Sequence, residues 1–195
     1  MKNKLLVIGT LIVAVILVAL MAGYSPGESA KSIDTSGQLQ LGKPGAKVKV
    51  VLFIDLRCGT CQYYEEQIFP LIKRRYIDNN LIEYTVIPIA FLNGSTRLAT
   101  GYYCTRQQKP DLGMDYIQAT YAKDDVPYLP GINSGKLDRC IGSTRAHQYV
   151  ENNMEIAEKA MGKHKVATPT LYVNGVKVSE PTYTAISNAI NEALE

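Results

Sequence analysis

Apolar and polar residues alternate along the chain in a way that predicts strands separated by helices. Apolar, β-branched runs at 46–56 and 81–90 are typical of strands buried on both faces. Between them, from about residue 60 to 78–80, apolar residues recur at intervals of three and four, which predicts a helix with a kink at Pro70. The order strand, helix, strand favours a parallel crossover and an α/β fold.

The second half of the chain predicts helices first and a hairpin afterwards. From about residue 93 to 162 the spacing is helical and no strand pattern interrupts it, so we predict a helical insertion into the α/β domain. Residues 168–180 follow as two short strands joined by Asn174-Gly175, a strong hairpin signal. An amphipathic pattern at 182–195 predicts a closing helix.

The first 45 residues differ from the rest. Residues 5–24 are uncharged and apolar and follow lysines at positions 2 and 4, which is typical of a helix that crosses a membrane with its N-terminus in the cytoplasm. A cleaved signal segment is the alternative, although no Ala-x-Ala site follows the run. Residues 25–45 are rich in Gly, Ser and Pro and predict a flexible tether, ordered only near its end. Both interpretations of residues 5–24 place residues 46–195 outside the cytoplasm.

Composition and charge fit an ordinary globular domain. Of 195 residues, 46% are hydrophobic and 20% are charged. The formal net charge is +3, and the lysines at positions 2 and 4 contribute two of those charges. Because no basic patch remains, we expect no nucleic-acid partner.

The four cysteines suit a compartment in which disulfides persist, because their number is even. Cys58 and Cys61 are separated by two residues, so they form the natural local pair and leave Cys104 for Cys140. We expect the second pair to be a structural disulfide, whose closure would stabilise the fold by about 4 kcal/mol. A second redox relay and two free buried thiols are the alternatives.

The Cys58–Cys61 motif lies between a predicted strand and a predicted helix. There the first sulfur meets the free N–H groups and the positive end of the helix dipole, which favour a thiolate. Arg57 adds a positive charge beside it. We therefore predict that Cys58 is the nucleophile and Cys61 the resolving thiol of a redox-active disulfide.

Two other roles for the motif stay open. CxxC is also half of a zinc site, but structural zinc needs four ligands, and neither the other cysteines nor His147 and His164 form a second closely spaced pair. We expect no metal and no cofactor. The motif could also be an inert disulfide, in which case the chain would be a non-catalytic binding module with two structural bonds.

Three stretches together resemble the DsbA-like branch of the thioredoxin superfamily, which consists of extracytoplasmic thiol-disulfide oxidoreductases. They are FIDLRCGTCQYYEEQIFPLIKRRY, the helical middle with GYYCTRQQ and LDRCIGS, and VATPTLYVNGVKV. The resemblance covers about residues 46–195 and implies a thioredoxin fold with a helical insertion. It also implies a cis bond between Thr168 and Pro169, in a loop that packs against the CxxC motif and whose Thr168 backbone pairs with the substrate. Without the resemblance, a trans proline that opens an edge strand would be the simpler interpretation.

The chain departs from that family at positions that would tune the redox centre. Gly59 and Thr60 lack the histidine that many strongly oxidising members have between the cysteines. Leu52 stands where relatives have a buried acid. Asp55 and Glu65 are the candidates to relay protons in its place, and a solvated or capping carboxylate is the alternative for each.

The resemblance implies an oxidase that accepts electrons from reduced cysteines of secreted or membrane proteins, with a quinone-linked membrane partner as its reoxidant. We expect a monomer, in the periplasm or at the outer face of the cytoplasmic membrane. The same centre could act as a reductase or an isomerase. An isomerase of this fold generally dimerises through an added domain, for which residues 25–45 are too short.

Overall fold

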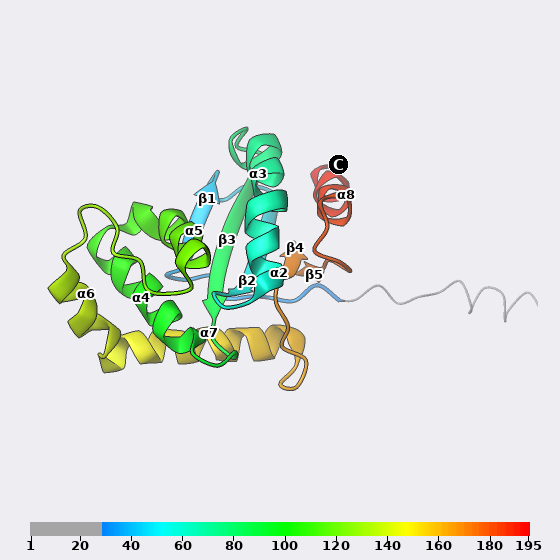
Figure 1. Cartoon of the computed structure of the whole chain (residues 1–195). Helices are drawn as coiled ribbons and strands as arrows, with labels where there is room; N and C mark the ends of the chain where they lie inside the picture. Colours follow the sequence, from blue (N-terminus) through cyan, green and yellow to red (C-terminus); the bar gives the residue numbers. More distant parts are fainter. Residues whose placement is uncertain (1–28) are drawn as a thin grey trace, which may run out of the picture.

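A five-stranded sheet forms the centre of the fold, with the strand order β1-β3-β2-β4-β5 (Figure 1). The computed structural model describes residues 29–195, so the predicted membrane or signal segment at 5–24 lies outside the described residues and stays a prediction. Among residues 29–195, no helix combines the length and the apolar character that crossing a membrane requires. The strands are β1 (Leu39–Gly42), β2 (Val48–Asp55), β3 (Ile82–Ile89), β4 (Thr170–Val173) and β5 (Val176–Lys177).

The pairing of the strands confirms the predicted crossover and hairpin. β2 and β3 run parallel, with Val48 beside Ile82 at one end of the ladder. β4 runs antiparallel to β2 and continues into β5 through Asn174 and Gly175. These two residues have φ values of 46° and 81°, both in the left-handed region that a two-residue hairpin turn needs.

Successive residues of β2 point into two different layers of the core. Leu52 belongs to the larger apolar cluster, on the side of α8 (Tyr183–Leu194). Phe53 belongs to a second cluster, which packs against α7 (Thr144–Met161). Figure 1 shows α7 crossing one face of the sheet while α2, α3 and α8 lie on the other. The prediction that this strand is buried on both faces is therefore confirmed.

The helix predicted after the CxxC motif is present but is not a uniform α-helix. Two π-helical stretches interrupt it, and one of them ends just before Pro70. Proline has no N–H to donate and its ring conflicts with the carbonyl four residues earlier, and a wider turn relieves both problems. The four parts are α2 (Gly59–Tyr63), η1 (Tyr64–Ile68), α3 (Phe69–Ile72) and η2 (Lys73–Ile77).

Helices fill the stretch between β3 and β4, as predicted for the insertion. In Figure 1, α4, α5 and α6 gather to one side of the sheet, and α7 leads from them back under it. Gly162 is the C-cap residue of α7, with a φ of 96° that glycine adopts at little cost. The other helices of this stretch are α4 (Ser95–Gln108), η3 (Pro110–Leu112), α5 (Gly113–Lys123) and α6 (Ser134–Ile141).

β1 lies near the end of residues 25–45, the part of the predicted tether that we expect to be ordered. β1 adds to the sheet antiparallel to β3, with Leu39 opposite Val86. The Leu39 side chain is buried and reaches α5 closely enough that a Cβ on Gly113 would lie 2.9 Å from it. Lys31 donates its N–H to the Gly175 carbonyl at 2.8 Å, so the segment before β1 also contacts the sheet.

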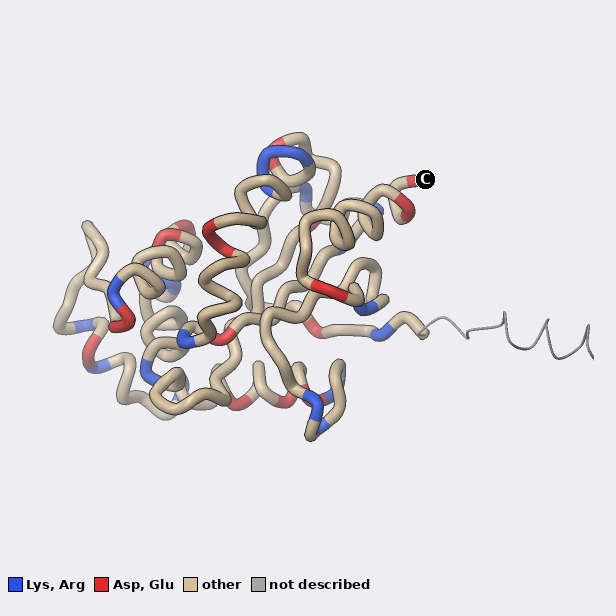
Figure 2. Tube along the Cα trace, turned by 45° about the vertical axis from the view of Figure 1, so that its right-hand side comes forward, with Lys and Arg blue, Asp and Glu red and all other residues tan. Residues whose placement is uncertain are grey.

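Charged residues of both signs are interspersed over the described chain (Figure 2). Two of the ion pairs illustrate this mixing: Arg57 with Asp124 and Lys73 with Asp78.

Candidate active site

Cys58 and Cys61 lie where β2 passes into α2, in the predicted strand-to-helix arrangement. Cys58 is the N-cap residue of α2, and its N–H donates to the Asp55 carbonyl at 3.0 Å. Both cysteines are free thiols, but Cys58 is only partly buried whereas Cys61 has no exposed surface. A reaction partner from solution therefore meets Cys58 first.

The loop that carries Thr168 and Pro169 packs against these sulfurs. The peptide bond between the two residues is cis, as the resemblance implies. The Cys58 sulfur lies 3.4 Å from the Thr168 carbonyl oxygen, to which it can donate while it is protonated. The Thr168 hydroxyl is buried beside both sulfurs, and it lowers the pKa of Cys58 and of Cys61.

The two thiols differ sharply in acidity. A hydrogen bond from the Cys61 thiol is the largest cause that lowers the pKa of Cys58, from its ordinary 9.0 to about 5. Partial burial opposes this shift, while the Thr168 side chain and the backbone N–H groups of Cys61 and Thr60 add to it. Burial, in contrast, raises the pKa of Cys61 far above its ordinary value. At neutral pH the negative charge therefore rests on Cys58 and the proton on Cys61.

The structure places the residues around the motif in different settings. The backbone N–H groups at the start of α2 do stabilise the thiolate, and Thr60 contributes through its N–H. Gly59 is exposed, and a Cβ added there would meet no atom within 4 Å. The Arg57 guanidinium pairs with Asp124 at 2.7 Å, so the structure directs this charge to another segment, and a tuning role for Arg57 stays a prediction.

Asp55 is a capping carboxylate. Its side chain is fully buried and accepts hydrogen bonds from the N–H groups of Arg57 at 2.9 Å, Phe91 at 3.0 Å and Leu92 at 3.1 Å. These bonds hold the turn that carries Cys58 against the loop that follows β3. The solvated alternative is wrong for Asp55, and the capping alternative is confirmed.

Glu65 is buried beside the centre, with 5% of its surface exposed. Gln118 of α5 donates a long hydrogen bond of 3.4 Å to its carboxylate. Burial raises the pKa of Glu65 from 4.5 to about 7, which keeps much of this group protonated near neutral pH. The solvated alternative is therefore wrong for Glu65 as well.

Tyr121 of α5 completes the site and has no counterpart in the sequence predictions. Its hydroxyl donates to the Asp55 carbonyl at 3.2 Å. Burial is the largest cause that raises the pKa of Tyr121, and the nearby Cys61 and Glu65 add to it. The Tyr121 phenol therefore lies near enough to the Cys61 thiol and the Glu65 carboxyl for their charges to affect its pKa. No spacing in the sequence relates Tyr121 to the motif, because the insertion brings it there.

A cavity of about 310 Å³ opens beside Cys58, between α2 and the end of α5. Its lining includes Arg57, Gln62, Tyr121 and Asp124. The nucleophilic sulfur thus faces a space with polar walls, which can receive part of a reaction partner.

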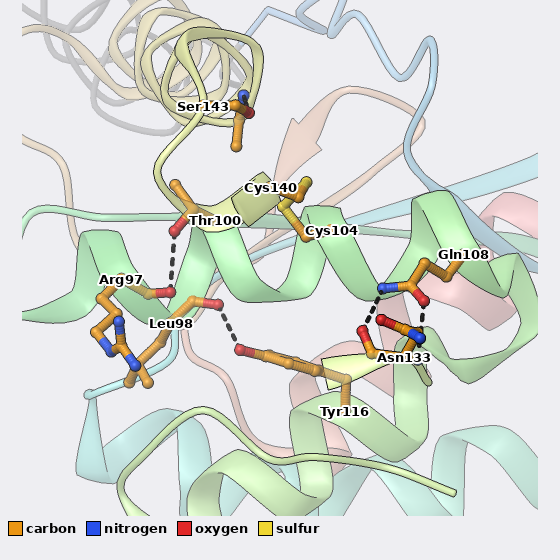
Figure 3. Close-up of a disulfide and its surroundings, with 10 residues drawn as sticks. Arg97, Leu98, Thr100, Cys104, Gln108, Tyr116, Asn133, Cys140 and Ser143 are labelled. Carbon is orange, nitrogen blue, oxygen red and sulfur yellow. Dashed lines mark hydrogen bonds between the residues drawn. A yellow bond between two sulfur atoms is a disulfide. The ribbon is translucent and has the colours of Figure 1, made fainter. Parts of the chain in front are cut away.

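The other cysteine pair is a disulfide that joins α4 to α6 (Figure 3). Cys104 has no exposed surface, and Cys140 lies 36 residues further along the chain. The Gln108 side chain bridges the same helices, because it accepts from the Asn133 N–H at 3.0 Å and donates to the Asn133 carbonyl at 3.3 Å. The alternative of two free thiols is wrong, and these sulfurs are not available to complete a zinc site.

Comparisons with known proteins agree with this geometry. The family model described as thioredoxin matches residues 34–192. Disulfide bond formation protein D of Bacillus subtilis is 27% identical over 173 residues, which cover 82% of this chain and 78% of the relative. The chain spans only 59% to 64% of the length of the rickettsial relatives that it matches.

Solved structures establish the fold. The crystal structure of oxidised BdbD from Bacillus subtilis superposes with a TM-score of 0.75 at 24% identity, covering 86% of this chain and 98% of that one. Chlamydia trachomatis DsbA superposes with a TM-score of 0.72 at 23% identity, covering 86% and 96%. Both likenesses extend over most of each chain and show a common fold.

Proposed function

We propose, from the premise that this chain belongs to the thioredoxin family and to its DsbA-like branch, that it is a thiol-disulfide oxidoreductase which introduces disulfides into other proteins. One observation carries the proposal: Cys58 is accessible with a pKa of about 5, whereas Cys61 is buried with a raised pKa. This asymmetry supports the proposal that Cys58 is the sulfur that exchanges with the partner and Cys61 is the resolving thiol.

In the proposed cycle, the Cys58–Cys61 disulfide oxidises a client dithiol. A client thiolate attacks the Cys58 sulfur, the bond to Cys61 breaks, and Cys61 takes up a proton. The second client thiolate then attacks the client sulfur of this mixed disulfide, and Cys58 leaves as a thiolate. A leaving thiol of low pKa departs faster, so the stabilised thiolate drives the reaction toward client oxidation.

Thr168 is proposed to hold the client during this exchange. Its carbonyl lies 3.4 Å from the Cys58 sulfur, next to the cis bond with Pro169. A client backbone that pairs with this loop as an added strand would present its cysteine directly to Cys58.

Glu65, and not Asp55, is the proposed carrier of the proton that Cys61 needs. Asp55 accepts from three backbone N–H groups, which hold its carboxylate in a structural role. Glu65 is buried, its pKa of about 7 lets it hold and release a proton near neutral pH, and it lies near enough to Tyr121, as does Cys61, to raise the pKa of that phenol.

The remaining parts of the proposal concern location and partners. Residues 5–24 are proposed to tether the domain at the outer face of the cytoplasmic membrane, unless they are cleaved. The clients would be reduced secreted or membrane proteins, and a quinone-linked membrane protein would reoxidise the centre. The chain is proposed to act as a monomer.

The low pKa of Cys58 weighs against the two alternatives. A reductase must give up electrons readily from its dithiol form. A strongly stabilised Cys58 thiolate makes that dithiol form a weaker reductant. A binding module with two inert bonds would have no use for an accessible, acidic thiol.

The test is to equilibrate the full chain with graded ratios of reduced and oxidised glutathione and to trap the Cys58–Cys61 state by alkylation. A potential clearly more oxidising than about −200 mV supports the oxidase, and one near about −270 mV favours a reductase. With a client that carries a disulfide, a Cys61→Ser variant should accumulate mixed disulfides, because Cys58 attacks the client disulfide, one client sulfur leaves as a thiolate and no resolving thiol follows; a Cys58→Ser variant should form none. A pair that stays oxidised below about −300 mV would refute every catalytic role.

A further inference from the structure

An ion pair forms one wall of the cavity beside Cys58. Arg57 Nη2 lies 2.7 Å from Asp124 Oδ2, and Arg57 Nη1 donates to the Asn93 carbonyl at 3.4 Å. Gly94 makes room for this arrangement, because a Cβ at that position would lie 2.6 Å from Arg57 Nη1. The guanidinium of the residue next to the nucleophile is thus bound to other segments and not to the sulfur.

Asp124 occupies a backbone position that suits glycine better. It ends α5 with a φ of 51°, in the left-handed region, where a residue with a Cβ costs about 1 kcal/mol and where glycine is the usual choice. Its backbone N–H donates to the Thr120 carbonyl at 2.8 Å, a bond that any residue could make. The contact that requires the Asp124 side chain is the one to Arg57.

We propose that Asp124 is a positioning residue that holds the Arg57 guanidinium off the Cys58 sulfur and thereby limits the oxidising strength of the centre. This inference rests on the proposed function, because it concerns the equilibrium of the same site. Arg57 and Cys58 both line the cavity of about 310 Å³, so a released guanidinium has space to turn toward the sulfur. The side chains of the pair are 39% and 63% exposed, so solvent can reach the pair and it can open.

The equilibrium with glutathione reports this effect directly. Two glutathione thiols reduce the Cys58–Cys61 disulfide, and the products are one Cys58 thiolate, one Cys61 thiol, one glutathione disulfide and one proton. Two electrons pass from glutathione to the protein. A positive charge that approaches the Cys58 thiolate stabilises the reduced products and makes the disulfide a stronger oxidant.

The experiment compares the full chain with an Asp124→Asn variant in glutathione buffers. Asparagine adopts the left-handed region readily, so the end of α5 is kept while the charge is lost. We expect the equilibrium to move about fivefold toward the reduced form, the effect of one unit charge at about 4 Å in water. The pKa of the Cys58 thiol should fall in parallel. Asp124→Gly, which also relaxes the backbone, should give the same shift.

The control variant is Asp78→Asn. It removes the other surface ion pair, Lys73 with Asp78 at 2.6 Å, whose side chains are 48% and 49% exposed. Because this pair lies at the far end of the helix that begins after Cys58, the equilibrium with glutathione should stay within about twofold of the unmodified value.

An Arg57→Gln background separates the proposed effect from the loss of the Asp124 charge itself. If Asp124 acts through Arg57, Asp124→Asn should change nothing in that background. A shift that persists there, or no shift in either Asp124 variant, overturns the inference. Failure of the unmodified pair to exchange with glutathione at all would instead refute the proposed function, so the two failures are distinguishable.

Discussion

Replacing Glu65 with glutamine should stabilise the fold at high pH and leave it unchanged at low pH. Glu65 is buried, and its pKa is raised from 4.5 to about 7. A carboxyl with a raised pKa binds its proton more tightly in the folded state, so its stabilising effect is complete below pH 4.5 and is lost as the pH rises through about 7. Glutamine keeps the shape and can accept the hydrogen bond from Gln118, but it never ionises.

The size of the effect follows from the two pKa values. One pKa unit corresponds to about 1.4 kcal/mol, so the difference between 4.5 and about 7 is worth about 3 kcal/mol once the group is ionised in both states. The free energy of unfolding of Glu65→Gln should therefore match that of the parent at about pH 4 and exceed it by about 3 kcal/mol at about pH 8.

The assay is guanidinium unfolding followed by far-ultraviolet circular dichroism, because the chain has no tryptophan to report on the core. A Cys58→Ser, Cys61→Ser background keeps the Cys104–Cys140 disulfide and removes the Cys58 thiol, which would titrate in the same range.

Glu66→Gln is the matched control, because Glu66 is the exposed neighbour that accepts from Gln62 at 2.9 Å. It should change stability by less than about 0.5 kcal/mol at either pH. If Glu65→Gln shows the same difference at both pH values, the pKa of Glu65 is not raised. If it destabilises the fold at about pH 8, the carboxylate is ionised and held by an interaction that the structure lacks.

Three further predictions concern the sulfurs. In the reduced protein, the rate at which iodoacetamide alkylates Cys58 should be half-maximal near pH 5 and flat near neutral pH, because a lowered pKa keeps the thiolate populated above pH 5. A rate that still rises tenfold per pH unit near neutrality would contradict this prediction. Thr168→Val removes the hydroxyl beside both sulfurs, so it should raise the pKa of Cys58 by about one unit in the same titration, and an unchanged pKa would show that the hydroxyl has no part in the site. Replacing both Cys104 and Cys140 by serine should lower the free energy of unfolding by about 4 kcal/mol on the chain-entropy model. The alkylation profile of Cys58 should stay unchanged, and an altered profile would mean that the second disulfide is more than structural.

The sequence predicts the central strands and the sulfur chemistry well because their signals are local. β2 and β3 carry long β-branched runs, and the CxxC motif is complete within four residues. β1 is missed because a four-residue edge strand with one buried leucine, Leu39, leaves too short a pattern among Gly, Ser and Pro.

Predictions about charge miss partners that are distant along the chain. Arg57 is next to Cys58, but its partner Asp124 lies 67 residues away in the insertion. The burial of Glu65 likewise depends on α5, which supplies Gln118 from 53 residues away. Periodicity identifies which residues face a core, but it does not say which helix of an insertion covers a given carboxylate.

The contact between Cys58 and Thr168 also has a consequence for the order in which the protein matures. The two residues are 110 positions apart, so a growing chain exposes both sulfurs of the motif long before Thr168 has been synthesised. Until then Cys58 lacks one of the groups that lower its pKa and is closer to an ordinary cysteine. The most reactive thiol thus gains its full reactivity only when almost the whole domain is present, which limits its chance to form wrong disulfides with Cys104 of the same unfinished chain.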